Sequence, residues 1–397
     1  MRFLLVSLLF SSSLSLAALP TGKLFSSLVQ SKILEASNGD PSRYPQFTDQ
    51  VEGIWQYFDA NQWTSGFFPA TLYEFHKRTL LCPSSSSKTD WLSLGRQWSE
   101  SIAPLAFTAN NLQHDVGFVS FPFQEELKIS NQTNTTAIPV INGFANDLAA
   151  RFSPIVGCTQ SWDTADPTDF QVIIDNMMNL DLLFISAGLT QNDTLRQIAI
   201  SHADHTIENH VRPDGSSFHV VEYNSTTGNV IRRRTAQGYA DNSTWSRGQA
   251  WGIYGFATMY ENTQLERYLD TSRRMATYFK NTLPEDGIVP WDFNAPLVPS
   301  PRPADSSAAT IAATGLLLLS RIESNRKNST GAKLWSDFAI SLLDRITDLA
   351  WRPEWQSLLS NGTVNEPAGN ELTGIVYGDY YYIKAGNDLV VMGLTKC

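Results

Sequence analysis

The stretch FQVIIDNMMNLDLLFIS, residues 170–186, is apolar around most of a helical wheel. A helix that is apolar on nearly every face belongs inside a protein. The stretch nevertheless carries Asp175, Asn176, Asn179 and Asp181. A buried carboxylate is costly unless it is paired, hydrogen-bonded or protonated. Asp175 is therefore either a cap or cross-link to neighbouring elements, or a carboxyl whose raised pKa lets it hold and deliver a proton near neutral pH.

The same pattern recurs along the chain, because loops that contain Gly or Asp precede helices rich in small and aromatic residues. These helices are predicted to start at Gly66, Gly117, Asp175, Gly248, Ser307 and Tyr377. Conventional amphipathic helices alternate with them, predicted over residues 91–103, 193–210, 265–280 and 331–348. The alternation predicts an all-α fold, an (α/α)6 barrel or toroid, as one domain over residues 18–397. An open array of helical repeats is the structural alternative.

Two further segments refine this prediction. Residues 218–223 and 229–234 flank a Gly-bearing loop and predict a small β-hairpin insertion. The final segment after Ala385, GNDLVVMGLTKC, lacks a strong amphipathic pattern, so we expect the last inner helix to be short.

The first 17 residues have the form of a secretory signal peptide, with a basic start, an apolar run and small residues before the expected cleavage site. No later apolar stretch is long enough to span a bilayer. Seven N-x-S/T sequons agree with a secreted, extracellular glycoprotein: Asn131, Asn134, Asn192, Asn224, Asn242, Asn328 and Asn361. Asn242 lies inside a dense motif, where we expect it to be enclosed.

Composition excludes several classes of function. A net charge of −10 without a long basic run argues against a nucleic-acid partner. Three cysteines permit at most one internal disulfide. The histidines show no metal-binding spacing, and His202 and His205 share a face predicted to be ordinary outer-helix surface. No P-loop, dinucleotide fingerprint or G-x-S-x-G elbow occurs, so we expect no metal and no cofactor. We also expect a monomer.

In a helical toroid the loops before the inner helices meet at one end, where a ligand would bind. Trp63 precedes the first inner helix and either stacks on a sugar face or belongs to the core. His114 and Asp115 precede the second, where Asp115 is either a helix cap or a second carboxyl paired with Asp175.

The segment QGYADNSTWSRGQAW, residues 237–251, is the densest in polar and aromatic residues. Arg247 within it either offers a donor fork to a ligand carboxylate or pairs with Asp241. His219 follows a turn signal and stands on the first strand of the predicted hairpin. A lone strand histidine is more often structural than catalytic.

With these motifs in hand, the chain resembles the unsaturated glucuronyl hydrolases, glycoside hydrolase family 88. The resemblance rests on several blocks in one order: WTSGFFPATLYEF, HDVGF, VGCTQSWD, VIIDNMMNLDLLF, HVRPDGSSFHVV, QGYADNSTWSRGQAWGIYGF, VPWDFNAP and YGDYYY. It implies an (α/α)6 barrel without metal that removes a terminal 4,5-unsaturated uronic acid from oligosaccharides made by polysaccharide lyases.

The resemblance also implies roles for individual residues. Asp175 corresponds to the general acid and base, and Asp115 to the second essential carboxyl. The positions implied to bind the sugar are Trp63, His114, Trp162, His219, Gln237, Trp245, Arg247 and Trp251, with Tyr377 as a further candidate. We expect apolar neighbours and an ionised Asp115 to raise the pKa of Asp175. The alternatives are an unsaturated rhamnogalacturonyl hydrolase acting on pectin fragments and a non-catalytic carbohydrate-binding toroid.

Overall fold

The computed structural model describes residues 21–83, 88–130, 133–297 and 303–397. The expected signal peptide and the sequon at Asn131 lie outside these residues. No helix within the described ranges is long and apolar enough to cross a membrane.

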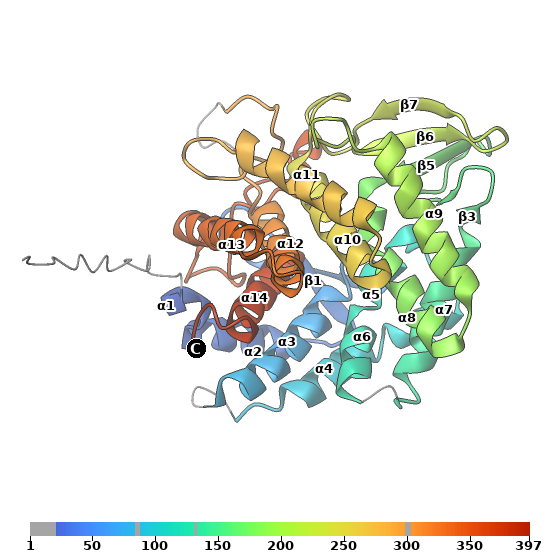
Figure 1. Cartoon of the computed structure of the whole chain (residues 1–397). Helices are drawn as coiled ribbons and strands as arrows, with labels where there is room; N and C mark the ends of the chain where they lie inside the picture. The colour runs from blue at the N-terminus through green and yellow to red at the C-terminus, as the bar shows by residue number, and fades with distance from the viewer. Residues whose placement is uncertain (1–20, 84–87, 131–132, 298–302) are drawn as a thin grey trace, which may run out of the picture.

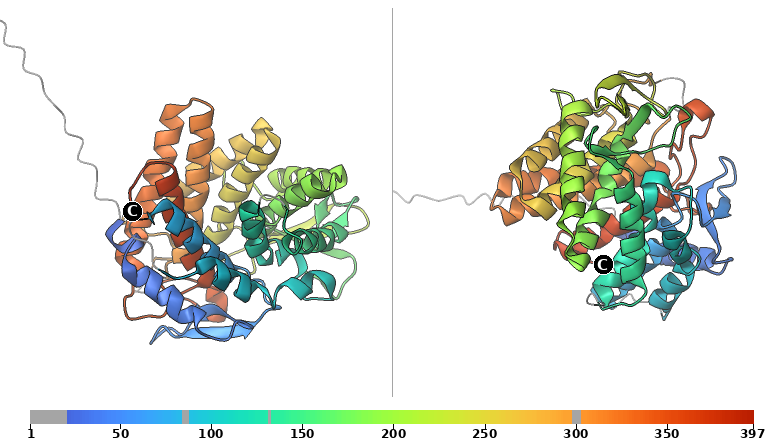
Figure 2. Two further views of the ribbon diagram at one scale, coloured as in Figure 1. Left: turned by 90° about the horizontal axis from the view of Figure 1, so that it is seen from below. Right: turned by 90° about the vertical axis from the view of Figure 1, so that its right-hand side faces the viewer.

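Two layers of helices form a closed ring (Figures 1 and 2). The inner layer consists of α3 (Phe67–Leu81), α5 (Val116–Val119) with α6 (Phe121–Ile129), α8 (Leu180–Thr190), α10 (Ser246–Thr263), α12 (Ser306–Asn325) and α14 (Val376–Val391). The outer layer consists of α2 (Ser27–Ser37), α4 (Trp91–Ser99), α7 (Ala137–Ala150), α9 (Asp193–Asn209), α11 (Glu266–Thr282) and α13 (Ser329–Ala350). Because α14 packs against α3, the ring is closed and the open array is wrong. The predicted (α/α)6 toroid is confirmed.

Two points about the helices need correction. The sequence interpretation did not assign α2 or α7, and α7 contains Pro139 and Gly143, which weaken a helix pattern. The last inner helix is not short, because α14 continues to Val391. Buried Asn387 accepts a hydrogen bond from Arg78 Nε at 2.8 Å and donates to Glu74 of α3 at 2.7 Å. The end of α14 lacks an amphipathic pattern, and hydrogen bonds to α3 hold it in place.

The stretch 170–186 is not one helix. It begins as strand β5 (Asp169–Ile173), turns through the 3-10 segment η4 (Ile174–Met178), and becomes helical only in α8. The β-branched residues Val172 and Ile173 favour a strand and pair with β6 (Val220–Asn224). The predicted hairpin of β6 and β7 (Val230–Arg234) is present, and β5 extends it to a three-stranded sheet in the order β5-β6-β7.

The remaining elements are short. Two-stranded sheets pair β1 (Arg43–Thr48) with β2 (Trp55–Asp59) and β3 (Phe152–Ser153) with β4 (Cys158–Thr159). Short helical segments are α1 (Thr21–Leu24), η2 (Ala103–Phe107), η3 (Gln113–Asp115) and η5 (Glu366–Ala368).

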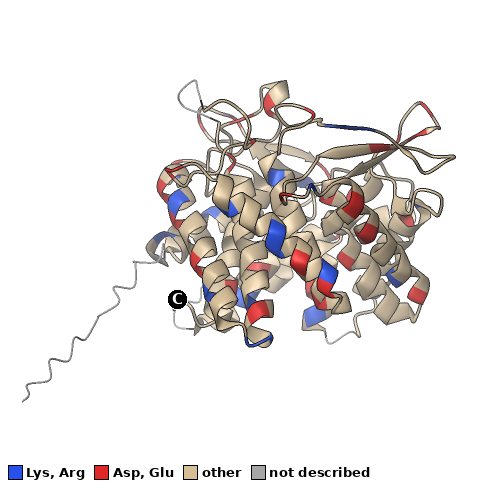
Figure 3. Ribbon diagram, turned by 45° about the horizontal axis from the view of Figure 1, so that its top comes forward, with Lys and Arg blue, Asp and Glu red and all other residues tan. Residues whose placement is uncertain are grey.

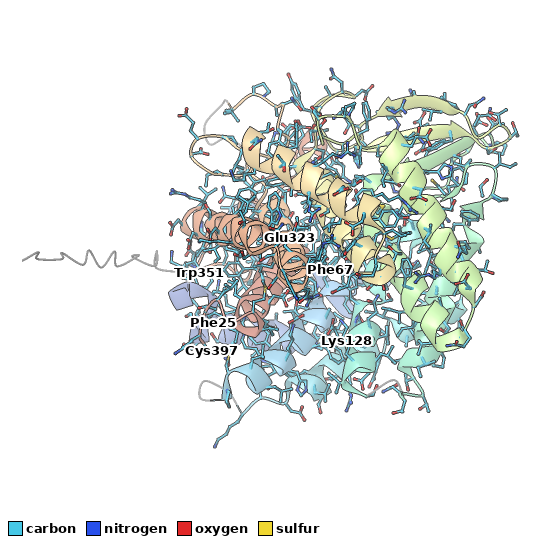
Figure 4. All side chains as sticks on the ribbon, viewed as in Figure 1. Phe25, Phe67, Lys128, Glu323, Trp351 and Cys397 are labelled. Carbon is cyan, nitrogen blue, oxygen red and sulfur yellow. A yellow bond between two sulfur atoms is a disulfide. The ribbon has the colours of Figure 1, made fainter. Side chains whose placement is uncertain are left out.

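The apolar core is continuous from Leu24 to Leu389. Phe67, near the middle of the ring in Figure 4, contacts the rings of Phe118 and Tyr377 at centroid distances of 5.4 and 5.6 Å. A disulfide joins Cys82, at the end of α3, to Cys397. Charged residues of both signs are spread over the helices, as Figure 3 shows, so the negative net charge is not gathered into one stripe.

Glycines at the starts of the inner helices bring neighbouring loops into close contact. A Cβ atom on Gly66 would lie 2.3 Å from the carbonyl oxygen of Phe118. One on Gly117 would lie 2.4 Å from Asn179 Oδ1, and one on Gly248 would lie 2.9 Å from Ile174 Cγ2. Such distances leave no room for a side chain, so the glycines of the repeated pattern allow the loops to converge at one end of the ring.

Candidate active site

Asp115 ends η3, immediately before α5, at the converging loops. It occupies the N-cap position of α5 but makes no side-chain capping hydrogen bond, so the helix-cap alternative is wrong. Its Oδ1 lies 3.4 Å from His114 Nε2, and its side chain is 18% exposed. A partly exposed carboxyl without a structural hydrogen bond is available for chemistry.

Asp175 lies in η4, between β5 and α8. Its Oδ1 is buried without a protein hydrogen-bond partner, so no cross-link accounts for this atom. The neighbouring amides do form cross-links: Asn176 Nδ2 donates to Thr159 Oγ1 at 2.7 Å, and Asn179 Oδ1 accepts from the Phe118 amide at 3.0 Å. The amides of Asn176 and Asn179 thus hold the neighbouring loops, whereas Asp175 Oδ1 does not.

Burial raises the pKa of Asp175 from its ordinary 3.8 to about 7, although the nearby charge of Arg247 opposes the rise. Burial and the charge of Asp175 together raise the pKa of Asp115 well above its ordinary value. The expected role of burial at Asp175 therefore agrees with the structure. The repulsion between the two carboxyls belongs to the pair, because it raises the pKa of whichever group ionises second, and it adds to the effect of burial.

Arg247, the second residue of α10, is almost fully buried. Its Nη1 donates to Asp305 Oδ2 at 2.9 Å, and its Nη2 donates to Gln237 Oε1 at 2.6 Å and to the Val364 carbonyl at 2.8 Å. The donor fork is therefore engaged within the protein and is not paired with Asp241. Only Nε lacks a protein partner, so it is the one guanidinium nitrogen of Arg247 left free to donate to a ligand.

His219 directly precedes β6 and stacks on Trp245 at a centroid distance of 4.2 Å. Its Nδ1 accepts hydrogen bonds from the amides of Ala236 and Gln237 at 3.2 and 3.4 Å. Burial lowers the pKa of His219 well below its ordinary value, so the ring is neutral and its proton lies on Nε2. Nε2 is buried without a protein partner, which makes it a donor for a ligand.

Trp63 and Trp162 line one pocket with Asp115, with a cavity volume of about 260 Å³. The other lining residues are Asn61, Gln62, Asn111, Leu112 and Gln113. Trp162 lies 6.4 Å from His219 between ring centroids, and Trp63 lies 5.0 Å from Tyr377. Trp63 is only partly buried, so it is available to stack on a sugar.

Trp251, on α10, is fully buried. Its ring contacts Phe118 at a centroid distance of 5.1 Å, and its Nε1 has no protein partner. His114 is also buried, with an exposed fraction of 2%. Neither of these two predicted sugar-binding residues lines the pocket itself.

A larger cavity, of about 380 Å³, lies where the inner helices end. Its charges are largely compensated within the protein, since Lys128 pairs with Glu125 at 2.7 Å and Lys384 pairs with Asp388 at 3.4 Å. Asp115 and Asp175 have no such cationic partner within salt-bridge distance. The smaller cavity is therefore the candidate active site despite its size.

Buried polar atoms without a protein hydrogen-bond partner gather at this end of the ring. They are Ser65 Oγ, His114 Nδ1, Asp175 Oδ1, Asn176 Oδ1, Asn179 Nδ2, His219 Nε2, Ser246 Oγ, Arg247 Nε, Trp251 Nε1 and the Tyr377 hydroxyl. Buried polar groups are normally paired, so such a cluster indicates a surface that binds a polar ligand.

Two functional positions escaped the sequence interpretation. Asp305 caps α12, accepting hydrogen bonds from the amides of Ser307 and Ala308, and also holds Arg247. The sequence feature that could have identified Asp305 is the run Asp-Ser-Ser at the start of α12, which is typical of a helix N-cap. His202 was expected on the outer surface, but it is fully buried against β4, where its Nδ1 accepts from the Thr159 amide at 3.1 Å.

Two other predictions concern modification and metals. The side chain of Asn242 is exposed, so the expectation that it is enclosed is wrong. In the described part of the chain, no group of three or more His, Cys, Asp or Glu residues is arranged to hold a metal ion.

The chain is similar to known proteins along most of its length, although no protein-family model matches it. The unsaturated glucuronyl hydrolase of Formosa agariphila is 36% identical over 335 residues, covering 82% of this chain and 79% of the relative. The crystal structure of an unsaturated glucuronyl hydrolase specific for heparin superposes with a TM-score of 0.83 at 27% identity, covering 94% of this chain and 98% of that one. A structure of UGL with dGlcA-Glc-Rha-Glc has a TM-score of 0.83 at 28% identity, covering 94% of this chain and 97% of that one.

Proposed function

The chain belongs to the unsaturated glucuronyl hydrolases, which are glycoside hydrolases, and from this membership we propose its reaction and the roles of its residues. The enzyme removes a 4,5-unsaturated uronic acid from the non-reducing end of lyase-generated oligosaccharides by hydrating the C4=C5 double bond. The observation that carries this proposal is the pair Asp115 and Asp175, two carboxyls with raised pKa values, of which Asp115 lines a pocket together with Trp63 and Trp162.

In the proposed reaction, the protonated Asp175 carboxyl delivers its proton to C4. Positive charge develops at C5 and the ring oxygen. Water then adds at C5, and the Asp175 carboxylate takes a proton from that water. The resulting hemiketal opens and releases the rest of the oligosaccharide. The pKa of about 7 suits this cycle, because Asp175 can both give and regain a proton near neutral pH.

Other residues of the pocket support binding of the sugar. Trp63 and Trp162 offer aromatic faces to the pyranose rings. His219 Nε2 donates to a ligand oxygen, and the buried charge of Arg247 favours the uronate carboxylate. Gln237 and Trp245 hold this arrangement together, since Gln237 accepts from Arg247 and Trp245 lies beneath both the guanidinium and His219.

The cellular context is likewise a proposal. The first 17 residues direct the chain to export, and the mature protein is an extracellular, monomeric glycoprotein. The sequon asparagines Asn192, Asn242 and Asn328 have exposed side chains and are accessible for glycosylation.

A direct assay tests the reaction. Purified protein is incubated with unsaturated disaccharides from a glycosaminoglycan and from rhamnogalacturonan, and the absorbance of the double bond is followed. We expect loss of absorbance with the glycosaminoglycan product and none with Asp175→Asn. Loss only with the rhamnogalacturonan product would favour the unsaturated rhamnogalacturonyl hydrolase. Binding of either sugar without loss of absorbance would indicate a non-catalytic carbohydrate-binding protein.

A further inference from the structure

The pocket beside Asp115 is lined almost entirely by uncharged side chains. Trp63 and Trp162 supply aromatic faces, and among the described residues that line the pocket Asp115 is the only one with an ionisable side chain. The remaining polar lining consists of four carboxamides, those of Asn61, Gln62, Asn111 and Gln113. The lining that the structure describes therefore contains no lysine and no arginine.

The carboxamides keep hydrogen-bonding capacity for a ligand. Asn61 Oδ1 accepts from the Asn111 amide at 3.1 Å, and Gln113 Oε1 accepts from the Asp163 amide at 3.3 Å. These two bonds use the oxygen atoms and do not engage the NH₂ groups. The side chains of Gln62 and Asn111 are exposed. Because a carboxamide both donates and accepts, this lining suits the hydroxyl and acetamido groups of a neutral sugar.

Arg151 is the cation whose charge reaches Asp115, where it opposes the rise in pKa. Its Nη2 donates to Asp163 Oδ1 at 2.7 Å, and its Nε donates to the Gln160 carbonyl at 2.7 Å. The Arg151 guanidinium is therefore already paired, and its charge is compensated by Asp163.

Arg232 and Arg234, on strand β7, are paired in the same way. Both donate through Nε to the carboxylate of Glu222 on β6, Arg232 at 2.5 Å. Glu222 first of all, and then Asp169 and Asp241, raise the pKa of Arg232. The positive charge of this strand is thus balanced by three acidic residues.

The loop that holds Arg247 adds negative charge. The carbonyl oxygens of Thr363 and Val364 accept hydrogen bonds from its guanidinium. Glu366 and Glu371 follow on the same loop, and burial and the charge of Glu371 raise the pKa of Glu366. Arg247 itself is almost fully buried, and in the proposed function it faces the uronate carboxylate. A second anionic group on the substrate would therefore meet acidic side chains and arginines that are already paired.

We propose that this pocket selects a neutral sugar next to the unsaturated uronate, so that unsulfated oligosaccharides are the preferred substrates. This inference rests on the proposed function, whose substrate class it narrows. A sulfate group placed against the carboxamides would lose water without gaining a counter-charge, and burying an unpaired charge is costly. A neutral sugar exchanges its hydrogen bonds with water for bonds to the carboxamides and stacks on the tryptophans.

Two disaccharides that differ by one sulfate group test the preference. Purified full-length protein is incubated with the unsaturated disaccharide of unsulfated chondroitin and, separately, with its 6-O-sulfated counterpart. The loss of double-bond absorbance gives kcat/KM for each. We expect kcat/KM to be at least about tenfold higher for the unsulfated disaccharide, because like charges placed together disfavour binding. Equal values, or a higher value for the sulfated disaccharide, would overturn the proposal.

The variant Gln62→Lys places a cation among the carboxamides at an exposed position. We expect the ratio of kcat/KM for the sulfated to the unsulfated disaccharide to rise about two- to fivefold at low salt, and this gain to shrink at high salt. The control Gln197→Lys makes the same charge change at an exposed position of the outer helix α9 and should leave both values unchanged. An unchanged ratio in folded Gln62→Lys would contradict the proposal.

The two proposals can fail separately. A protein that consumes both disaccharides equally well keeps the proposed reaction and loses the preference. A protein that consumes neither refutes the proposed reaction, and titration calorimetry with the same two disaccharides then decides on the preference. Tighter binding of the unsulfated disaccharide would support it, and equal binding or no binding of either would refute it.

Discussion

The substitution Asp175→Asn should abolish turnover and stabilise the fold, and the size of the stabilisation should depend on pH. Asp175 has a pKa of about 7 in the folded protein and an ordinary value of 3.8. Each pKa unit corresponds to about 1.4 kcal/mol, so the ionised carboxyl costs the folded state about 4 kcal/mol. Asparagine has nearly the same shape and does not ionise.

The pH dependence of this stabilisation follows from the raised pKa of Asp175. Below pH 3.8 the carboxyl is protonated in both states and costs nothing. Between pH 3.8 and about 7 only the unfolded chain ionises, so the folded state progressively loses relative stability as pH rises. Above about 7 both states ionise and the penalty stays constant. Asp175→Asn removes this penalty.

Urea unfolding at several pH values between 4 and 8 measures the effect. We expect the free energy of unfolding of Asp175→Asn to equal that of wild type within error near pH 4, and to exceed it by up to about 4 kcal/mol at pH 8. The exposed carboxyl of Asp337 provides the control, since Asp337→Asn should change little at any pH. A difference that is absent at pH 8, or constant with pH, would show that Asp175 is not held protonated by burial.

Three further outcomes are expected. The wild-type kcat/KM should fall about tenfold for each pH unit above about 7, as Asp175 loses its proton, and a profile flat to pH 9 would contradict its role as the acid. Arg247→Lys should reduce kcat/KM about 100-fold, because an ammonium group cannot reproduce the fork to Asp305 and its neighbours; near-normal steady-state kinetics would refute this. Gly117→Ala should destabilise the fold by about 1–3 kcal/mol, because its Cβ would overlap Asn179, and an unchanged thermal midpoint would show that the loops can separate without cost.

The sequence determined the architecture because its hydrophobic pattern is set by local geometry. Small and aromatic residues behind Gly or Asp predicted the inner helix starts except the third, where the helix begins at Leu180 and not at Asp175. The structure shows why the glycines are needed at Gly66, Gly117 and Gly248. The hairpin was likewise predictable from its turn and its two β-rich runs. Periodicity alone could not separate strand from helix in residues 170–186, where pairing with β6 makes a strand of residues 170–173 only.

The sequence also supplied the residues of the site, but not their partners. Asp175 stood among apolar neighbours, which was enough to predict its raised pKa. The partner of Arg247 is Asp305, which is 58 positions away along the chain, and not the nearby Asp241. His202 is joined to Asn176 by hydrogen bonds through Thr159, which no local pattern shows.

Local chemistry can therefore be read along the chain, because burial patterns and turn residues act over a few positions. Charge and proton placement depend on which groups come within a few ångströms when the ring closes. The stretch 170–186 by itself determined that a carboxyl would be buried. Only the tertiary structure decided that Asp175 Oδ1 has no cross-linking partner and that Asp115 lies close enough for the two carboxyls to interact.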